Sequence, residues 1–383
     1  MFQMAVEIPL VSGELPPVEL LDATNTDAIL YMTVFPRANP IFSATGYEAY
    51  EQLAPQGVID ELVELVEGYV KGGRKLMIRI ASEMNGGWNA YSQRPIHFIA
   101  LWRRIVDAIR ARIPASNGSI AFLWSPNSGN GYPFPRGAYS PYKDSQAPFT
   151  AANAVHADDF KLMDTNSDGV VDSEDDPYSP YWPGPEYVDW VGLSLYYFGL
   201  SFPWLRNQLP TTHYFLDQLE GGSTRRGNIT VSSVNFYDTY SGPTSAFKKP
   251  MIISETAAAF HISMIGPPRT ALDAGPGSLA LKQAYWRQYI TNSSFLLAHP
   301  ALKGICLFEW EKDEEETFRD YRSTWSPDIL AAFKADFQKV AASFIQGKKA
   351  SLVTYTNAEA GSAKPTALSA AFAMYILFQV LFV

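Results

Sequence analysis

Short apolar runs of strand length alternate with helical patterns along most of this 383-residue chain. Seven runs are predicted as strands: Phe2 to Pro9, Ala28 to Phe35, Leu76 to Ala81, Ile120 to Trp124, Tyr187 to Tyr197, Met251 to Ser254 and Ile305 to Trp310. Helices are predicted from their periodicity over Val58 to Lys71, Ile96 to Arg112, Ser278 to Leu297 and Ile329 to Ile345. Strands that alternate with helices indicate a parallel sheet.

The number of strand–helix units favours a closed barrel over an open parallel sheet. Repeated strand–helix units, with long aromatic loops after the strands, are typical of a (β/α)8 TIM barrel rather than an open sheet. Seven strands are one fewer than that barrel contains. A Rossmann fold is not predicted, because no Gly-x-Gly-x-x-Gly segment follows any of the strands. The expected fold class is therefore α/β, a barrel lacking one β/α unit.

Composition excludes several function classes. The net charge is −9 and no long Lys/Arg cluster occurs, so nucleic-acid binding has no electrostatic basis. The single cysteine, Cys306, lies in the apolar run ICLF and is expected to be a buried small hydrophobe. The five histidines show no zinc-ligand spacing, and no Gly-x-Ser-x-Gly elbow is present, so metal hydrolase and esterase chemistry are not predicted. Aromatic residues make up 14% of the chain, which suits stacking on sugar rings.

Two predicted strands end in a carboxylate. Glu83 follows the run Leu76 to Ala81, and Glu255 ends PMIISET. Side chains alternate along a strand, so Arg79 and Glu83 are expected on one face. Two acids at the C-terminal ends of parallel strands are the minimum equipment for cleaving a glycosidic bond. A structural ion pair would give the same pattern.

Both segments resemble a known family. Arg79 to Trp88, RIASEMNGGW, resembles the acid/base signature of glycoside hydrolase family 26, and IISET is similar to the nucleophile strand of the same clan of (β/α)8-barrel glycosidases. The resemblance spans roughly residues 1 to 345. It implies that the missing unit is the first and that Phe2 to Pro9 is the second barrel strand. This chain has Ser82 where the family usually has His.

The resemblance also implies roles for the two acids. Glu83 would be the general acid/base and Glu255 the nucleophile of a retaining mechanism, which places the carboxyl groups about 5–5.5 Å apart. Arg79 is expected to hold Glu255 charged. In barrels of this clan a tyrosine at the place of Tyr196 binds the nucleophile, and a tryptophan at the place of Trp310 forms the floor under the sugar.

Further residues are expected to line the substrate cleft. The substrate-binding set is Arg79, Asn85, Trp88, Trp124, Tyr196 and Trp310, with Asn127 and Tyr132 as additional candidates. For each aromatic residue in this set, packing in the protein core is the alternative.

A calcium-loop pattern lies in the long segment after Trp124, between the fifth and sixth strands of the expected barrel. Asp164 to Asp175 matches D-x-[DN]-x-[DN]-G, with Gly169 at position 6. The predicted ligands are Asp164, Asn166, Asp168, the carbonyl of Val170, Asp172 and Asp175. No cofactor is expected for catalysis. We expect a structural Ca²⁺ that orders this loop near the cleft, and a solvated acidic loop is the alternative.

The C-terminal residues indicate where the protein is located in or outside the cell. Residues 368–383 form a 16-residue uncharged tail after a linker at 347–367, and small residues near Ala360 precede it. This order is typical of a GPI-anchor signal, and a tail anchor is the second interpretation. Three sequons, at Asn117, Asn228 and Asn292, are compatible with secretion. Met1 to Leu10 is not a signal peptide, so the natural N-terminus is expected to be missing.

These patterns together predict one main function. Residues 1–346 are expected to form the catalytic domain of a monomer that is secreted or GPI-anchored. The domain is expected to be a retaining glycoside hydrolase, similar to endo-β-1,4-mannanases, that acts on a β-linked polysaccharide. The alternatives are a β-glucanase or xylanase on the same barrel, and a non-catalytic glycan-binding barrel.

Overall fold

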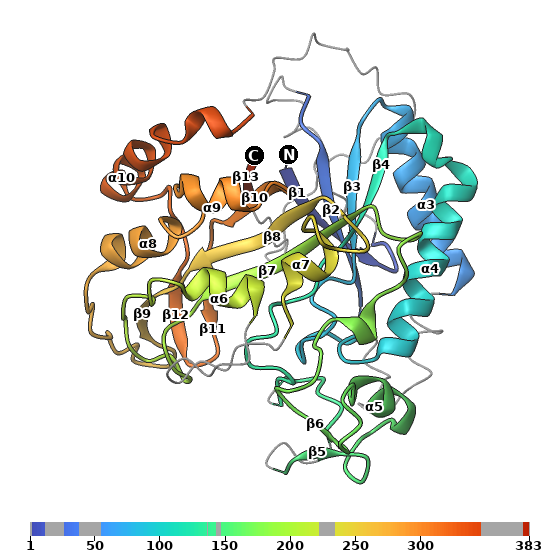
Figure 1. Cartoon of the computed structure of the whole chain (residues 1–383), viewed down its shortest axis with the longest axis horizontal. Coiled ribbons are helices and arrows are strands. Elements are labelled where there is room, and N and C mark those ends of the chain that lie inside the picture. The colour runs from blue at the N-terminus through green and yellow to red at the C-terminus, as the bar shows by residue number, and fades with distance from the viewer. Residues whose placement is uncertain are drawn as a thin grey trace.

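The computed structural model describes residues 2–11, 27–37, 55–135, 137–142, 147–221, 234–345 and 378–382. Its centre is a sheet of neighbouring strands, with α3 and α4 on one side and α8, α9 and α10 on the other (Figure 1). The predicted linker at 347–367, the anchor signal except for 378–382, and the sequon at Asn228 lie outside the described residues.

Seven strands of the main sheet are parallel and follow one another in chain order. They are β1 (Phe2–Ile8), β2 (Leu30–Pro36), β3 (Leu76–Ile80), β4 (Ile120–Trp124), β7 (Trp190–Tyr197), β8 (Met251–Ala258) and β10 (Leu302–Phe308). Each corresponds to one predicted strand, although β8 runs four residues further than expected. The predicted α/β fold of parallel strands and outer helices, of the TIM-barrel type, is confirmed.

An eighth strand lies between the two ends of this parallel series and is hydrogen-bonded to one of them. Strand β13 (Phe378–Phe382) pairs antiparallel with β10 and also contacts β1. It therefore lies where an additional parallel strand would stand in a complete (β/α)8 barrel.

Helices follow most of the strands. They are α3 (Gln56–Lys71), α4 (Pro95–Arg112), α6 (Tyr214–Glu220), α7 (Phe236–Tyr240), α8 (Ser278–Trp286), α9 (Ser293–Ala298) and α10 (Pro327–Gln338). Helix α3 buries Ile59, Leu62, Val63 and Val66, which recur at the spacing of one helical face. Two short helices, α6 and α7, lie between β7 and β8, where the sequence predicted no helix.

Two predicted helices are shorter than expected. The helix expected over Ser278 to Leu297 is split into α8 and α9, because the side-chain oxygen of Asn292 accepts a hydrogen bond from the backbone N–H of Phe295 (3.1 Å) and caps a new helix. Helix α10 ends at Gln338, and a 3-10 turn, η3 (Ala341–Ser343), follows it.

The long segment between β4 and β7 forms a small subdomain at one end of the barrel (Figure 1). Its elements are η2 (Ser179–Tyr181), α5 (Ala157–Met163) and the antiparallel pair β5 (Phe149–Thr150) and β6 (Val170–Val171). It has its own apolar cluster, which includes Phe160 and Met163. The side chain of Asp159 accepts the backbone N–H of Ile96 (3.2 Å), which fastens α5 to the start of α4. A further 3-10 turn, η1 (Ala115–Asn117), follows α4.

A second sheet, which the sequence did not predict, extends from the ends of β8 and β10. It consists of β9 (Phe260–Met264), β12 (Thr317–Asp320) and β11 (Glu311–Glu314), all antiparallel. Because β9 follows β8 and β11 follows β10, this sheet rises from the C-terminal edge of the barrel. That edge is also where both candidate carboxylates are located.

The barrel interior is filled with side chains. Tyr31, Met77, Leu123, Ile252 and Cys306 belong to one buried cluster on the inner face of the sheet. The prediction that Cys306 is buried is confirmed, since its side chain is fully inaccessible. Within the described ranges, no helix is both long and apolar enough to cross a membrane.

Candidate active site

Glu83 is presented by a sharp turn and not by a continuing strand. Strand β3 ends at Ile80, and Ala81 and Glu83 both have positive φ angles, 45° and 56°. The expected alternation of Arg79 and Glu83 on one strand face therefore does not extend to Glu83. Left-handed backbone at a non-glycine residue costs about 1–3 kcal/mol, and such strain gathers at functional sites. The backbone N–H of Glu83 donates to the carbonyl of Ser125 (2.9 Å), which fixes the turn against the end of β4.

The loop after Glu83 places an indole against its carboxyl group. Trp88 Nε1 donates to Glu83 Oε2 at 2.9 Å. Gly86 makes this possible, because a Cβ at that position would stand 2.4 Å from the Trp88 ring. Asn85 ties the loop to the end of β4 through two hydrogen bonds of 2.8 Å with the backbone of Asn127.

Glu255 lies within β8 and has a separate donor for each carboxylate oxygen. Arg79 Nη1 donates to Oε1, and Tyr196 Oη donates to Oε2 at 2.8 Å. The Arg79 side chain is completely buried, whereas that of Glu255 is 15% exposed. Glu255 is therefore oriented from below by β3 and β7, and its charge is compensated by a guanidinium that water does not reach.

The electrostatic environments of the two acids differ. Burial raises the pKa of Glu83, and the charge of Glu255 raises it further. Arg79, with hydrogen bonds from Ser194 and Trp88, lowers the pKa of Glu83, but the net shift is upward. Burial also raises the pKa of Tyr196 well above its usual value, with smaller contributions from Glu255 and Glu83. The two carboxyl groups and the tyrosine therefore share one electrostatic site.

This arrangement can divide acid and nucleophile roles between two carboxyl groups. A carboxylic acid with a raised pKa keeps its proton for a leaving group, while a second carboxylate beside a buried arginine stays available for attack. Pairs of acids whose surroundings differ in this way are the chemical basis of glycoside hydrolysis.

Several predicted site residues are brought together by the fold. Glu83, Glu255, Arg79, Trp88 and Tyr196 form one connected group. Arg79 is fully buried, so it acts on Glu255 and the expectation that it contacts substrate is wrong. Trp310 follows β10 with 41% of its surface exposed.

Other predicted cleft residues lie in the core. Trp124 is completely buried, donates from Nε1 to the carbonyl of Tyr181 (2.9 Å) and stacks on Phe236. Tyr132 is 3% exposed and belongs to the apolar cluster of the insertion. Asn85 is also inaccessible and holds the backbone of Asn127. These expectations are corrected: the side chains hold loops together and do not face a substrate.

Ser82, which stands where the family usually has His, is also buried. Its side chain is 2% exposed, and its carbonyl accepts a hydrogen bond from Tyr91 Oη (2.8 Å). In this fold the residue before Glu83 therefore supports the turn.

Sequence reasoning missed one residue of the site. Ser194 lies on β7, is completely buried, and its Oγ accepts a hydrogen bond from Arg79 Nη2 (2.9 Å). Strand alternation could have found it, because Ser194 stands two residues before Tyr196 and therefore on the same face of the strand.

The predicted calcium loop is folded by its own backbone. The carboxylate of Asp164 accepts the N–H groups of Asp168 (3.1 Å) and Gly169 (3.0 Å), and Gly169 has a φ of 90°. Asp175 is 1% exposed and accepts N–H groups from Thr165, Asn166 and Asp172. The atoms that the predicted ligands would offer to a metal ion are all oxygens, which suits Ca²⁺. Among the described residues, however, no group of three or more His, Cys, Asp or Glu is gathered in a metal-binding arrangement.

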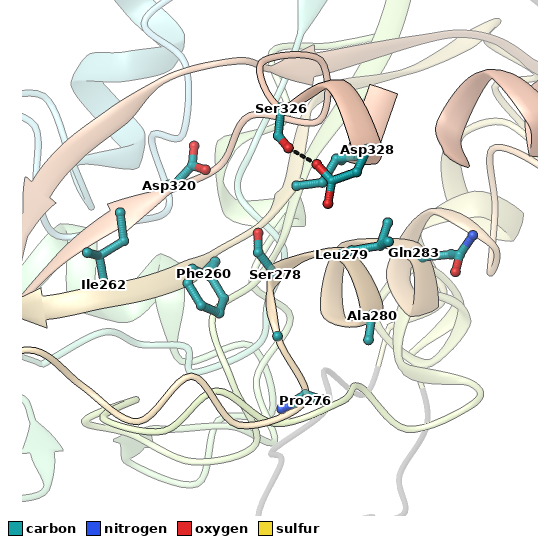
Figure 2. Close-up of a pocket in the computed structure, with 12 residues that line it drawn as sticks. Phe260, Ile262, Pro276, Ser278, Leu279, Ala280, Gln283, Asp320, Ser326 and Asp328 are labelled. Carbon is teal, nitrogen blue, oxygen red and sulfur yellow. Dashed lines mark hydrogen bonds between the residues drawn. The ribbon is translucent and has the colours of Figure 1, made fainter. Parts of the chain in front are cut away.

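Figure 2 shows an open hollow, of about 610 Å³, whose lining does not include Glu83 or Glu255. It is bounded by Phe260 and Ile262 of β9 and by the first turns of α8 and α10, where Ser326 Oγ donates to Asp328. None of the catalytic candidates belongs to its lining.

Fold and site together define an α/β barrel protein with two electrostatically linked carboxyl groups at its C-terminal edge. No family model matches the sequence, and no curated protein matches it. Solved structures of glycoside hydrolase family 26 (GH26) mannanases are similar to it. The catalytic domain of a GH26 endo-β-1,4-mannanase from Bacillus sp. JAMB-750 is 14% identical, with 85% of this chain and 70% of that chain covered and a TM-score of 0.43.

Two further structures show comparable similarity. A Cellulomonas fimi endo-β-1,4-mannanase double mutant is 12% identical, with 88% of this chain and 63% of that chain covered and a TM-score of 0.45. The Bacillus subtilis mannanase BCman is 12% identical, with 67% of this chain and 62% of that chain covered and a TM-score of 0.33. The chain thus spans less than two thirds of the length of these two proteins.

Replacing Glu255 by Gln is expected to lower the pKa of Glu83. A negative charge nearby opposes ionisation of a second carboxyl group, and the charge of Glu255 is one of the causes that raise the pKa of Glu83. The measurement is a carbon-13 NMR titration of glutamate carboxyl groups, with the Glu83 signal assigned by its loss in Glu83→Gln. Asp189→Asn, at the opposite end of the barrel, is the control. An unchanged Glu83 titration in Glu255→Gln would show that the two groups are not coupled.

Proposed function

We propose that this protein is a retaining glycoside hydrolase that cleaves a β-linked polysaccharide. The observation that carries the proposal is the linked pair at the C-terminal edge of the barrel. Glu83 has a raised pKa, and Glu255 is held by Arg79 and Tyr196. Active sites of (β/α)8 enzymes lie at this edge.

The proposed first step breaks the glycosidic bond. A carboxylate oxygen of Glu255 attacks the anomeric carbon, and the bond from that carbon to the leaving oxygen breaks as Glu83 gives its proton to that oxygen. In the second step Glu83 accepts a proton from water. The water oxygen bonds to the anomeric carbon, the ester bond to Glu255 breaks, and Glu255 is released as a carboxylate with net retention of configuration.

Exposed aromatic side chains would bind the sugar around this pair. Trp88 is 39% exposed while its Nε1 contacts Glu83, so its ring is available beside the acid. Trp310 is 41% exposed at the end of β10. Aromatic side chains bury large areas through one rigid ring, which suits the apolar faces of pyranose units.

β-Mannan is the first substrate to be tested. The resemblance of Arg79 to Trp88 to the family 26 acid/base signature favours an endo-β-1,4-mannanase. Mixed-linkage β-glucan and xylan are the next candidates on the same barrel.

The test is release of reducing ends from β-mannan, mixed-linkage β-glucan, β-1,3-glucan and xylan, with proton NMR of the first anomer formed. We expect hydrolysis of one polymer, with the β-anomer appearing before mutarotation. An α-anomer formed first would reject the retaining mechanism. Polymer binding by the folded protein without any hydrolysis would instead support a glycan-binding barrel.

We also propose the location and assembly that the sequence indicates. The protein would act as a monomer outside the cell or at the cell surface, with residues 368–383 serving as a GPI-anchor signal, whose removal would take β13 away from its place beside β10. Release of the cell-bound protein by a phosphatidylinositol-specific phospholipase would support this anchor, and retention would favour a tail anchor.

Calcium is expected to stabilise the insertion between β4 and β7. The loop Asp164 to Asp175 keeps the calcium-loop sequence, and rotation of the Asp175 carboxylate away from backbone N–H groups would be needed to complete the ligand set. At a free Ca²⁺ concentration of 100 times Kd, the stability gain would be about 2.7 kcal/mol. Thermal melting with Ca²⁺ and with chelator measures it. Asp164→Ala should remove the rise in melting temperature that Ca²⁺ causes. Asp158→Ala, which changes an exposed residue of α5, should keep it. The same melting temperature in Ca²⁺ and in chelator would reject the site.

A further inference from the structure

Ser194 occupies the point where three functional side chains meet. It lies on β7 opposite Glu255 in the parallel register with β8, and it precedes Tyr196 by two residues. Its side chain is completely buried, so it does not contact substrate. Arg79 Nη2 donates to its Oγ at 2.9 Å, while Arg79 Nη1 donates to Glu255.

Ser194 has hydrogen-bonding capacity that its contact with Arg79 does not use. A serine hydroxyl has one proton to donate and can accept at the same time. Because arginine is only a donor, the contact with Arg79 leaves the proton of Ser194 unused, and Ser194 is one of the groups that lower the pKa of the Glu83 carboxyl. One buried hydroxyl therefore contacts the guanidinium that holds Glu255 and also influences the pKa of the group proposed to donate the proton.

We propose that Ser194 is a positioning residue that holds the Glu83 carboxyl in place and couples it to the Arg79–Glu255 pair. This rests on the proposed glycosidase function for its role in turnover, although the contacts themselves do not depend on it. Such a link fits the two-step reaction, in which Glu83 must first give up a proton and then take one from water.

Arg79 also depends on this hydroxyl. Among the described residues its Nε has no hydrogen-bond partner, so its two Nη atoms make the contacts that hold it. Without Ser194 Oγ, a second buried nitrogen of a charged group would lose its acceptor, which is unfavourable. The guanidinium would then be held on one side only, by Glu255.

The direction of the effect on Glu83 follows from the groups around it. Glu255 and burial raise the pKa of Glu83, whereas Arg79 and hydrogen bonds from Ser194 and Trp88 lower it. Tyr31, Tyr91 and Tyr196 also interact electrostatically with this carboxyl group, and burial raises the pKa of each, so they stay neutral in the working range. Loss of the Ser194 hydroxyl removes one donor to the ionised form, so the pKa of Glu83 is expected to rise.

The test compares Ser194→Ala with a matched control. Ser254→Ala removes another buried serine hydroxyl from the neighbouring strand, where it contacts Ser125 (2.6 Å). Ser194→Ala is expected to lower kcat about tenfold, since a hydrogen bond to a charged group is of that order. The alkaline limb of kcat/KM should move to higher pH, because that limb reports loss of the acid's proton in the free enzyme. Ser194→Thr, which keeps a hydroxyl, should restore the wild-type pH profile, and Ser254→Ala should also keep it.

A second readout does not require turnover. The Glu83 carboxyl is titrated by carbon-13 NMR in the wild type, Ser194→Ala and Ser254→Ala, with thermal melting to confirm that each is folded. A higher Glu83 pKa in Ser194→Ala alone supports the link, even if no polysaccharide is cleaved and the proposed function fails. An unchanged Glu83 titration in folded Ser194→Ala would overturn the proposal, whatever happens to kcat.

Discussion

Glu255→Ala is expected to lower hydrolysis of the preferred polysaccharide by about 10⁴-fold or more, the scale seen when a covalent nucleophile is removed. Glu255 is the carboxylate with a donor on each oxygen, and Arg79 and Tyr196 hold it in one orientation. Initial rates of reducing-end release measure the loss. Asp189→Asn, which removes a carboxylate at the N-terminal end of β7, is the control and should stay within a few-fold of wild type. A Glu255→Ala variant that keeps a tenth of the activity would reject a nucleophilic role.

Azide separates the roles of the two acids. In Glu255→Ala, azide can enter the space of the lost carboxylate and bond to the anomeric carbon as the aryloxy group of an aryl β-glycoside leaves, giving the inverted α-glycosyl azide. In Glu83→Ala, Glu255 still forms the ester, and azide then displaces it to give the β-glycosyl azide. Product configuration is read by NMR. The opposite pairing of variants and anomers would exchange the assigned roles.

Much of the barrel was predictable because each parallel strand contains a predominantly apolar run. Strands such as Ile120–Trp124 are apolar on both faces, and helices such as α3 show one apolar stripe. The sheet of β9, β11 and β12 has no such signal. Its strand Glu311–Glu314 reads EKDE and is held by pairing with Thr317–Asp320, which is a tertiary feature that local sequence does not encode.

The site residues that follow the end of an apolar strand were predictable from sequence. The residues whose role depends on whether the side chain is buried were not. Glu83 and Glu255 were found from their position after apolar runs, although the left-handed turn at Glu83 was not foreseen. Trp88 and Trp124 look alike in sequence. Trp124 is buried because Phe236, over a hundred residues later in the chain, stacks on it, whereas Trp88 follows Gly86 and stays partly exposed.

Arg79→Met is expected to destabilise the fold by about 3–5 kcal/mol, because removal of one partner leaves an unpaired charge in a buried pair. Arg79 is fully buried and Glu255 is 15% exposed, so little water can replace the guanidinium. Denaturant unfolding followed by circular dichroism measures the change. Arg269→Met, from the exposed pair with Asp313 (2.7 Å), is the control, and its cost should be about 0–1 kcal/mol.

The double variant Arg79→Met/Glu255→Gln shows whether charge or packing causes that loss. If the unpaired carboxylate is responsible, neutralising it should recover most of the stability, since a buried pair replaced on both sides is often close to neutral. Activity should stay absent, because the nucleophile is gone. A double variant as unstable as Arg79→Met alone would mean that the arginine stabilises the barrel through its packing and its contact with Ser194. In that case Glu255 would owe its orientation mainly to Tyr196.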